Sequence, residues 1–445
     1  MTTIYRFMLA IILGLANIPS FAGEVKLSTS KAVGQTITVA LDANITASIT
    51  WADGTKESFQ SDVMPKEFTV KSTDFTISSD EDITSLYLAN NGLTSLSVIG
   101  IRASLQRLYC QGNELTELDL SPATKLTTLD CQDNQLTSLR LGSKVVSNLN
   151  CAGNQLTSNG LTGVKELTSL VCANNEMNEM KYGASMEKLK VLIAQDNQLE
   201  ELNLEKSKNL KRMVASNNKL ANLSLNSAGL AELFISKNKL DTLDITSARK
   251  LEVIIATDNE LNLIRWEPDC SSTIKYAGLN NNALFFNSLP TIYEPRQRVY
   301  TLDATITPQR PFKIEENLNA NETYDWKQLL IYNGWNKVVQ TEISFIDANG
   351  TQLVSGDDYN YSAGKVTFNK QFNDIKLMAT SRYYPDVTLT SEPFNVNSPS
   401  GILSLEENNN NSSLTPIYTL SGIRIDGKAP QKGIYIVKGK KVVIK

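Results

Sequence analysis

Apolar positions recur along the middle of the chain with a period far longer than a helical turn or the alternation of a strand. Between residues 83 and 286 the phrase L-x-[LCA]-x-x-N-x-L returns, for example as "LDCQDNQL" at 129–136. A period of 20 to 23 residues is typical of a solenoid in which every repeat forms one coil. The sequence therefore predicts about ten stacked coils, each marked by one asparagine: Asn91, Asn113, Asn134, Asn154, Asn175, Asn197, Asn218, Asn238, Asn259 and Asn282.

Each repeat holds two short phrases in which apolar and polar residues alternate, such as "LYC" at 108–110 and "LDL" at 118–120. Alternation predicts a strand with one buried side, so a coil would consist of two strands and two turns. Neighbouring coils would pair in parallel, about 4.8 Å apart. A buried asparagine at a turn can satisfy backbone groups that the turn leaves unpaired. We therefore expect the ten asparagines to form a structural ladder.

Four cysteines occupy the second inward position of the first strand in successive coils: Cys110, Cys131, Cys151 and Cys172. Later coils place alanine, isoleucine or leucine there, so the position requires a small or medium apolar side chain, and buried cysteine behaves as one. Disulfides between neighbouring coils are possible by distance but hard by direction. Metal binding is disfavoured because no C-x-x-C spacing occurs. We expect free, buried thiols; Cys270 lies outside this ladder.

The phrase "LTTLDCQDNQLTSL" at 126–139 resembles the unit of bacterial leucine-rich-repeat proteins with internalin-like short repeats, of the Bacteroidetes type. The resemblance covers roughly residues 83–286. It implies a curved solenoid used for protein–protein contact and, in cell-surface members, for adhesion, and it implies no shared catalytic residues. Two stretches, 156–167 and 261–284, lose the second phrase, so the coil shape there is open.

The segments that flank the repeats also predict β-structure. Residues 23–82 alternate and contain the hairpin signal Asp53-Gly54, which favours an N-terminal β cap on the first coil. Residues 287–396 lose the period and show strand-like runs with turn signals at 349–350 and 363–364, as expected for an immunoglobulin-like β-sandwich. Its acids Asp347, Asp357 and Asp358 have no calcium-loop spacing, and turn chemistry explains them better.

The two ends of the chain resemble export signals. Residues 1–22 combine Arg6, a short apolar run and small residues before a cleavage point at Ala22, which predicts a signal peptide. Residues 397–413 form a polar linker rich in asparagine. Residues 414–445, with "KGIYIVKGKKVVIK", resemble the C-terminal sorting domain of type IX secretion cargo. The resemblance implies a secreted or surface-displayed protein. The alternatives are a small β domain that packs on its neighbour and a periplasmic location.

Charge and composition exclude several classes of function. The formal net charge is −4 and the sequence has no basic run, so it does not predict nucleic-acid binding. No second long apolar segment follows the predicted signal peptide. The chain has no histidine, which excludes Ser-His-Asp catalysis and histidine-ligated zinc. Glycan processing by Glu315, Glu316 or Asp325 is a less favoured alternative, because nothing in their spacing requires a catalytic carboxylate pair. We expect a protein that is not an enzyme and binds no cofactor or metal.

The candidate binding site lies at the outward positions of the first strands. There an apolar stripe is expected: Val171, Ile193, Val214, Phe234 and Ile255. An external protein, the following domain or the strand preference of β-branched residues could each account for it. We expect Arg212 and Glu232 to set polar specificity and Tyr109, with Tyr87, to act as an anchor. The sequence thus predicts an adhesion-type protein-binding repeat protein, with a structural envelope protein as the alternative; the partner is an extracellular protein or a glycan, and the oligomeric state is open.

Overall fold

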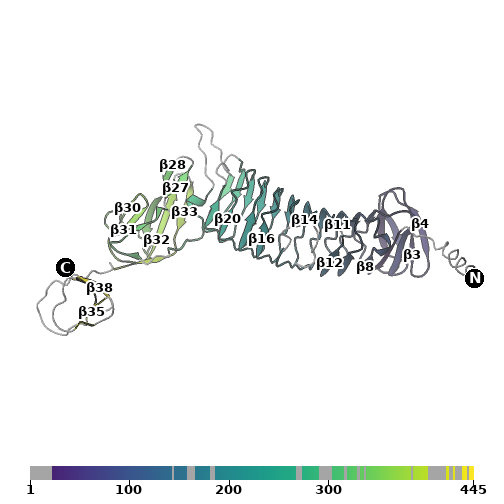
Figure 1. Ribbon diagram of the computed structural model, residues 1–445, viewed down its shortest axis with the longest axis horizontal. Helices are drawn as coiled ribbons and strands as arrows, with labels where there is room; N and C mark the ends of the chain where they lie inside the picture. Colours follow the sequence, from purple (N-terminus) through teal and green to yellow (C-terminus); the bar gives the residue numbers. More distant parts are fainter. Residues whose placement is uncertain are drawn as a thin grey trace, which may run out of the picture. The chain divides into compact units, whose positions relative to one another are not determined.

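The computed structural model of the 445-residue chain describes fourteen segments, and the following account concerns these residues. They are 23–142, 145–157, 166–180, 186–266, 273–289, 303–314, 318–327, 331–334, 337–381, 384–398, 417–419, 424–425, 433–437 and 440–444. The chain divides into two compact units (Figure 1). The first comprises Met1–Asn282 with Tyr293–Thr307, and the second comprises Ala283–Ile292 with Pro308–Lys445. The predicted signal peptide, most of the linker and Cys270 lie outside the described residues.

The first unit begins with an antiparallel sheet in the order β4-β3-β6-β1-β8. Its inward residues alternate along each strand, and Trp51 packs on Phe75 with 5.1 Å between the ring centroids. The tight turn at Gly54, with φ of 85°, joins β3 to β4 at the predicted hairpin signal. The bounds are β1 (Gly23–Thr29), β3 (Thr46–Trp51), β4 (Lys56–Gln60), β6 (Asp74–Ser79) and β8 (Leu93–Ser97).

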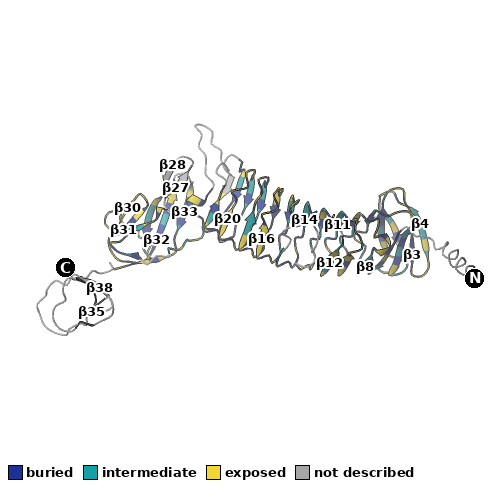
Figure 2. Cartoon of the chain, in the orientation of Figure 1, coloured by how far each residue is buried: buried dark blue, intermediate teal, exposed yellow. Residues whose placement is uncertain are grey.

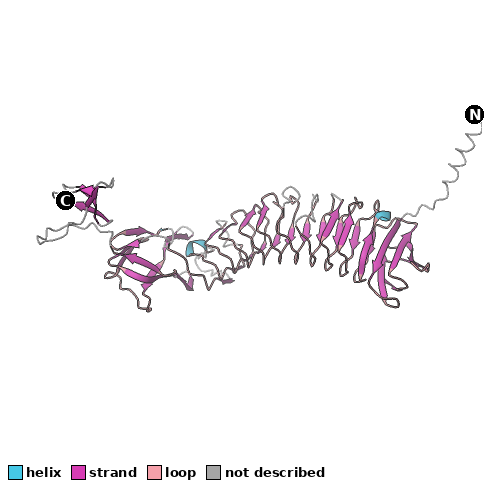
Figure 3. Ribbon diagram, turned by 90° about the horizontal axis from the view of Figure 1, so that it is seen from below, coloured by secondary structure: helices cyan, strands magenta, loops and turns pink. Residues whose placement is uncertain are grey.

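A 13-stranded sheet contains the first strands of the coils, and its parallel part runs from β7 to β24 (Figure 3). Corresponding residues face each other without a shift, as Leu86, Leu108 and Leu129 do. The parallel strands are β7 (Ser85–Tyr87), β9 (Arg107–Tyr109), β11 (Thr128–Asp130), β13 (Asn148–Asn150), β14 (Ser169–Val171), β15 (Val191–Ile193), β17 (Arg212–Val214), β19 (Glu232–Phe234), β21 (Val253–Ile255), β23 (Tyr276–Gly278) and β24 (Asp303–Thr305).

The second phrase of the first coil forms β8, which pairs with β1, and those of later coils form strands that pair two by two. They are β10 (Glu117–Leu120) with β12 (Ser138–Leu141), β16 (Glu201–Leu204) with β18 (Asn222–Leu225), and β20 (Thr242–Asp244) with β22 (Leu263–Arg265). In the described parts of 151–190 no second strand occurs, in line with the loss of the second phrase at 156–167. One 3₁₀ turn, η1 (Ile99–Ile101), lies in the first unit, and another, η4 (Phe286–Ser288), lies in the second unit.

The solenoid core is one continuous stack of buried residues, which are dark blue along the coils in Figure 2. In each first strand the central residue points inward, and Leu86, Leu108, Leu170 and Leu192 are fully buried. Burying such a side chain contributes about 1.5–3 kcal/mol. Because this burial repeats with every coil, the stack holds the coils together while the flanking strand residues face outward.

The second unit also consists of strands. One sheet has the order β25-β34-β32-β29, with β33 paired to β32, and a second has the order β26-β31-β30. Trp326, Phe345, Phe368 and Phe394 pack against one another with ring centroids 4.9–6.4 Å apart. The bounds are β25 (Leu318–Asn319), β26 (Thr323–Asp325), β27 (Ile331–Gly334), β28 (Lys337–Gln340), β29 (Glu342–Ile346), β30 (Tyr359–Ser362), β31 (Lys365–Phe368), β32 (Phe372–Ser381), β33 (Tyr384–Thr390) and β34 (Phe394–Asn397).

The acids of this unit serve its turns. The Asp347 carboxylate accepts hydrogen bonds from the backbone N–H groups of Asn349 and Thr351, at 2.9 and 2.8 Å. Asp358 accepts one from Val354 N–H at 2.7 Å and pairs with Lys370. The chain continues to an antiparallel sheet in the order β36-β35-β37-β38. Its strands are β35 (Ile417–Thr419), β36 (Arg424–Ile425), β37 (Gly433–Val437) and β38 (Lys440–Ile444).

The first coil is completed by the segment that precedes the repeats. β2 (Thr36–Leu41) pairs antiparallel with β7 on one side and with β5 (Lys66–Thr69) on the other. In later coils, two successive N–H groups donate to one carbonyl of the preceding coil, as Gln106 and Arg107 do to Thr84 O at 2.8 and 3.0 Å. The first coil has no preceding coil to supply that carbonyl.

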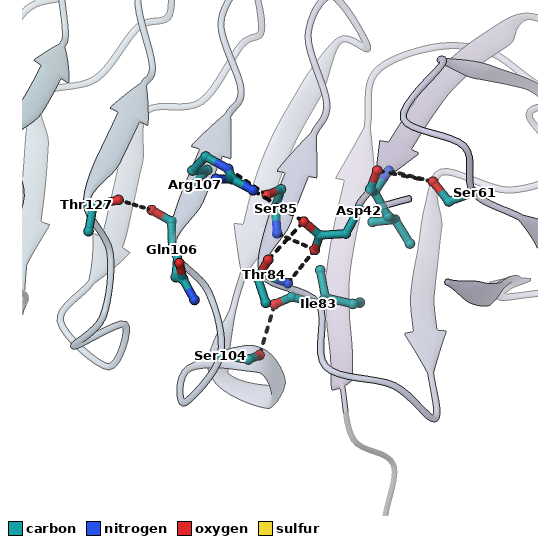
Figure 4. A network of polar contacts seen from close by, with 10 residues as sticks. Asp42, Ser61, Ile83, Thr84, Ser85, Ser104, Gln106, Arg107 and Thr127 are labelled. Carbon is teal, nitrogen blue, oxygen red and sulfur yellow. Dashed lines mark hydrogen bonds and ion pairs between the residues drawn. The ribbon is translucent and has the colours of Figure 1, made fainter. Parts of the chain in front are cut away.

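The carboxylate of Asp42 takes the place of the missing carbonyl (Figure 4). Its Oδ2 accepts from the N–H groups of Thr84 and Ser85 at 2.6 and 2.7 Å, and its Oδ1 accepts from Thr84 Oγ1 at 2.8 Å. Arg107 Nη2 lies 3.6 Å from the same Oδ1. Asp42 thus gives the first coil the acceptor that every later coil receives from its neighbour.

Loss of this acceptor should destabilise the solenoid. In the Asp42→Ala variant two partly buried N–H groups lose their partner, which should lower the free energy of unfolding by about 1–3 kcal/mol. Burial opposes ionisation of Asp42, but the hydrogen bonds from Ser85 and Thr84 outweigh it and lower the pKa of this carboxyl. Its contribution is therefore present above the unfolded-state pKa of about 3.9 and is lost as the pH falls through the folded-state value.

Thermal unfolding between pH 7 and pH 2 measures this effect. The difference in Tm between the wild type and Asp42→Asn should shrink as the pH falls, because asparagine keeps an acceptor but does not titrate. Asp80→Asn, at an exposed position in the same region, is the matched control. A constant difference between wild type and Asp42→Asn across this range would contradict the assignment.

Candidate functional site

The asparagine carboxamides join each coil to the one before it. Asn134 is typical: its Oδ1 accepts from Leu115 N–H at 3.1 Å, and its Nδ2 donates to Cys110 O at 2.9 Å and to Cys131 O at 3.2 Å. The nine asparagines from Asn113 to Asn282 repeat this arrangement. All are at most 9% exposed. Asn91 instead exchanges both bonds with Thr38 of β2, at 2.8 and 2.6 Å.

Sequence reasoning missed the residue that precedes each ladder asparagine. These residues have positive φ, between 53° and 66°, a conformation that favours Asn, Asp and Gly. They are Asn90, Gly112, Asp133, Gly153, Asn174, Asp196, Asn217, Lys237, Asp258 and Asn281. The repeated dipeptides Asn-Asn, Asp-Asn and Gly-Asn in the sequence carried this signal. Their regular turn directs every ladder asparagine inward.

The four ladder cysteines are free and fully buried. Burial raises the pKa of Cys172 to about 12 and raises the pKa of the other three thiols as well. Thiolates are therefore disfavoured at neutral pH, and these residues serve as core side chains rather than nucleophiles or metal ligands. Their carbonyls accept from the asparagine ladder, so the two ladders share one part of each coil.

The predicted apolar stripe forms one column on the outward face of the parallel strands. Val171 faces Ile193, Ile193 faces Val214, Val214 faces Phe234, and Phe234 faces Ile255. Four of these side chains are half-buried, which leaves part of each at the surface. Val214 is only 9% exposed because its short side chain lies between the larger Ile193 and Phe234. Val214 therefore offers less surface to a partner than the other four residues of the column.

Arg212 and Glu232 lie beside this column and bind each other. Arg212 Nη1 is 3.0 Å from Glu232 Oε2, and the guanidinium carbon lies 5.7 Å from the ring centroid of Phe234. Both side chains remain substantially exposed, and a surface ion pair of this kind contributes about 0–1 kcal/mol. The cation–π contact fixes the guanidinium over the column. The pair therefore shapes the rim of the column, with its charges mutually neutralised.

Tyr109 is not part of the same column. Its ring stacks on that of Tyr87 with centroids 4.7 Å apart and planes 2° apart. Between this stack and Val171 stand Asp130 and Asn150, whose strands β11 and β13 intervene. Asn150 Nδ2 donates to Gln132 Oε1 at 2.8 Å, and burial raises the pKa of the Asp130 carboxyl. The outward face thus has a polar half over β7–β13 and an apolar half over β14–β21.

The residues considered for glycan processing do not form a described site. Glu315 and Glu316 lie outside the described residues, and Asp325 is exposed with Lys327 Nζ 3.7 Å away. Among the residues that the structure describes, no group of three or more acids and cysteines is close enough to hold a metal ion. A hollow of about 400 Å³ is lined by residues of β8, β10 and β12 and includes both apolar side chains, such as Leu96 and Ile99, and the charged Glu117, Asp119 and Arg140.

The repeated asparagine phrase, the in-register parallel first strands and the ladder hydrogen bonds make the fold a leucine-rich-repeat solenoid. Comparison with solved structures finds the following chains. The functional domain of InlJ from Listeria monocytogenes, which includes a cysteine ladder, shares 19% identity over 73% of this chain and 92% of its own, with a TM-score of 0.26. YopM from Yersinia enterocolitica shares 22% over 52% of this chain and 57% of its own, with a TM-score of 0.35. The APL1 leucine-rich-repeat domain shares 19% over 59% of this chain and 58% of its own, with a TM-score of 0.34.

Searches against protein families and curated proteins found no match, and the described residues were also searched for membrane-spanning helices. In the described part of the solenoid and the second unit, no helix is both long and apolar enough to cross a membrane.

Proposed function

We propose that this leucine-rich-repeat protein binds a protein partner on the apolar half of the outward face, over β14–β21. One observation carries the proposal: Val171, Ile193, Phe234 and Ile255 are partly exposed and stand in register along one column. Neighbouring strands are about 4.8 Å apart, so the column spans roughly 20 Å. Contiguous apolar surface of this kind is typical of interfaces.

The surroundings of the column suit recognition. Val191 and Val253 flank it on the same strands, Tyr276 flanks it on the next strand β23, and all three are partly exposed. Arg212 and Glu232 supply polar groups at the rim. An apolar centre with a polar rim is the common arrangement of protein–protein interfaces. Because the asparagine ladder fixes the coils, the surface is formed before binding, and little conformational entropy is lost on association.

The alternative reading is that the column only reflects the preference of strands for β-branched residues. Phenylalanine at position 234 and the flanking Tyr276 are not β-branched, which favours an interface. A second alternative is a structural envelope protein without a specific ligand, in which replacement of the column residues would change no binding affinity. The following test separates these possibilities.

Replacing Ile193 and Phe234 together by serine should reduce binding at least about tenfold, since truncation of a buried interface anchor typically costs more than 1 kcal/mol. Peptides selected from a random 12-residue display library on the wild-type chain serve as the probe, and their Kd is measured by titration. The Tm should change little, because both side chains lie on the outward face and are already partly exposed. Ile99→Ser with Val145→Ser, at exposed apolar positions elsewhere, is the matched control.

Two results would count against the proposal. Selected peptides that bind the double variant as well as the wild type would remove the column from the interface. A cooperative unfolding transition lost in the double variant would instead assign both side chains to the core.

We further propose that the protein is secreted or displayed on the cell surface of a bacterium, where adhesion would be its role. The signal-like residues 1–22 and the sorting-like residues 414–445 support this, together with an immunoglobulin-like spacer at 287–396. The antiparallel order β36-β35-β37-β38 is consistent with a small terminal β domain.

Surface labelling of intact cells tests the location. Antibody labelling and protease sensitivity should be present for the full chain and lost when the chain ends at Ser413, because the sorting segment is then missing. A periplasmic marker protein controls for leakage. Equal labelling of both forms would rule out a sorting role for 414–445, and labelling of neither would place the protein inside the outer membrane.

A further inference from the structure

Two lysines without a carboxylate partner border the apolar column. Lys190 and Lys211 stand directly before β15 and β17, and both are exposed. Lys211 N–H donates to Lys190 O at 2.8 Å, so the two residues occupy the same point of neighbouring coils. The other cations along this edge are engaged: Lys188 pairs with Glu166, Lys275 pairs with Glu252, and Arg212 pairs with Glu232. Among the described residues no acid pairs with Lys190 or Lys211.

The opposite edge of the column carries mixed charge: the exposed Lys237 stands at the same position as two aspartates, and these acids are engaged. Asp196 and Asp258 follow β15 and β21 at the positive-φ position. Asn217 Nδ2 donates to Asp196 Oδ1 at 2.5 Å, and Asn281 Nδ2 donates to Asp258 Oδ1 at 2.8 Å. The carboxylates where the strands end are therefore held by hydrogen bonds, whereas Lys190 and Lys211, where the strands begin, have no acid partner among the described residues.

We propose that the partner segment bound to the column is both apolar and acidic, an inference that rests on the proposed function. Its apolar side chains contact Ile193 and Phe234, and its carboxylates lie over Lys190 and Lys211. A partner carboxylate relieves the repulsion between two neighbouring ammonium groups and gains strength as the interface excludes water. A basic segment meets the same two cations and is rejected. The chain as a whole has a formal charge of −4, so this positive edge is a local feature that orients an acidic partner.

The apolar column decides between two kinds of anion. A polyanion such as a nucleic acid or a polyphosphate requires many cations and gains nothing from a band of aliphatic side chains. An acidic peptide uses both the column and its edge. The geometry therefore favours a polypeptide segment that carries leucine-like or aromatic residues next to aspartate or glutamate.

Selection from the random 12-residue display library on the full chain, at about 0.15 M salt, tests the inference. Peptides whose binding depends on Ile193 and Phe234 should be enriched in acidic residues adjacent to apolar ones. Replacing both lysines, as Lys190→Glu with Lys211→Glu, should weaken these peptides at least tenfold, and a new selection on that variant should enrich basic residues. Lys190→Gln with Lys211→Gln should give an intermediate loss.

A matched control has the same charge change elsewhere. Lys219→Glu with Lys239→Glu alters two exposed lysines on neighbouring coils beyond the far ends of the strands, and it should leave peptide affinity within twofold. The Tm of each variant confirms that it folds.

Each failure has its own signature. Column-dependent peptides that are neutral or basic, or that bind the lysine variants equally well, would overturn the acidic partner and leave the proposed function intact. Absence of any column-dependent peptide would overturn both. Binding of polyphosphate that persists after replacement of Ile193 and Phe234 by serine would reassign the lysine edge to simple anion binding.

Discussion

The bridge made by one asparagine carboxamide between two coils is the interaction on which the solenoid depends. Each bridge satisfies a leucine or methionine N–H of the preceding coil and carbonyls of both coils, all of them buried. A buried backbone group left without a partner costs about 1–3 kcal/mol. Loss of one asparagine would leave several such groups unpaired and would lower the free energy of unfolding accordingly. Hydrophobic burial holds the coils together, but it does not by itself select one register. The carboxamide does so because its donor and acceptor must both meet their partners.

The outward face inherits its order from these bridges. Since every coil is fixed to the next without a shift, residues at equal positions align into columns, and a row of valine, isoleucine and phenylalanine becomes one surface. The same regularity creates a problem at the first coil, where the acceptors of a preceding coil are missing. The Asp42 carboxylate and the backbone carbonyl of Thr38 supply oxygens that accept the hydrogen bonds in their place. The flanking β-structure is thus part of the same hydrogen-bonding scheme as the repeats.

The sequence predicts most of this scheme because the repeats are local and periodic. The asparagine positions, the inward leucines and the buried cysteines follow from the spacing alone, since period and alternation decide which way a side chain points. They do not decide how much of an outward side chain its neighbours cover. The burial of Val214 depends on the size of Ile193 and Phe234, and the neutralised charge of Arg212 depends on the in-register Glu232. The sequence also does not predict the role of Asp42, because this role requires β2 to pair with β7, which is far away in the sequence.

The separation of the outward face into two halves also comes from side-chain contacts rather than from the period. Asp130 and Asn150 are ordinary polar residues in the sequence, yet their strands isolate the Tyr87–Tyr109 stack from the apolar column. The positive-φ residue before each ladder asparagine is Asp, Asn or Gly in every coil except that of Lys237, and this regular recurrence is a turn signal in the sequence. Functional interpretation therefore rests on geometry that only the assembled coils provide.

Hydrogen–deuterium exchange of the ladder amides tests the central claim most directly. The N–H groups of Leu115, Leu136, Leu199 and Leu220 donate to asparagine side chains, although none of them lies in a strand. If the carboxamide bridges fix the coils, these amides should exchange as slowly as those of the inward leucines in the parallel strands. Exchange at the rate of exposed loops, while the strands stay protected, would show that the bridges are not what holds the register.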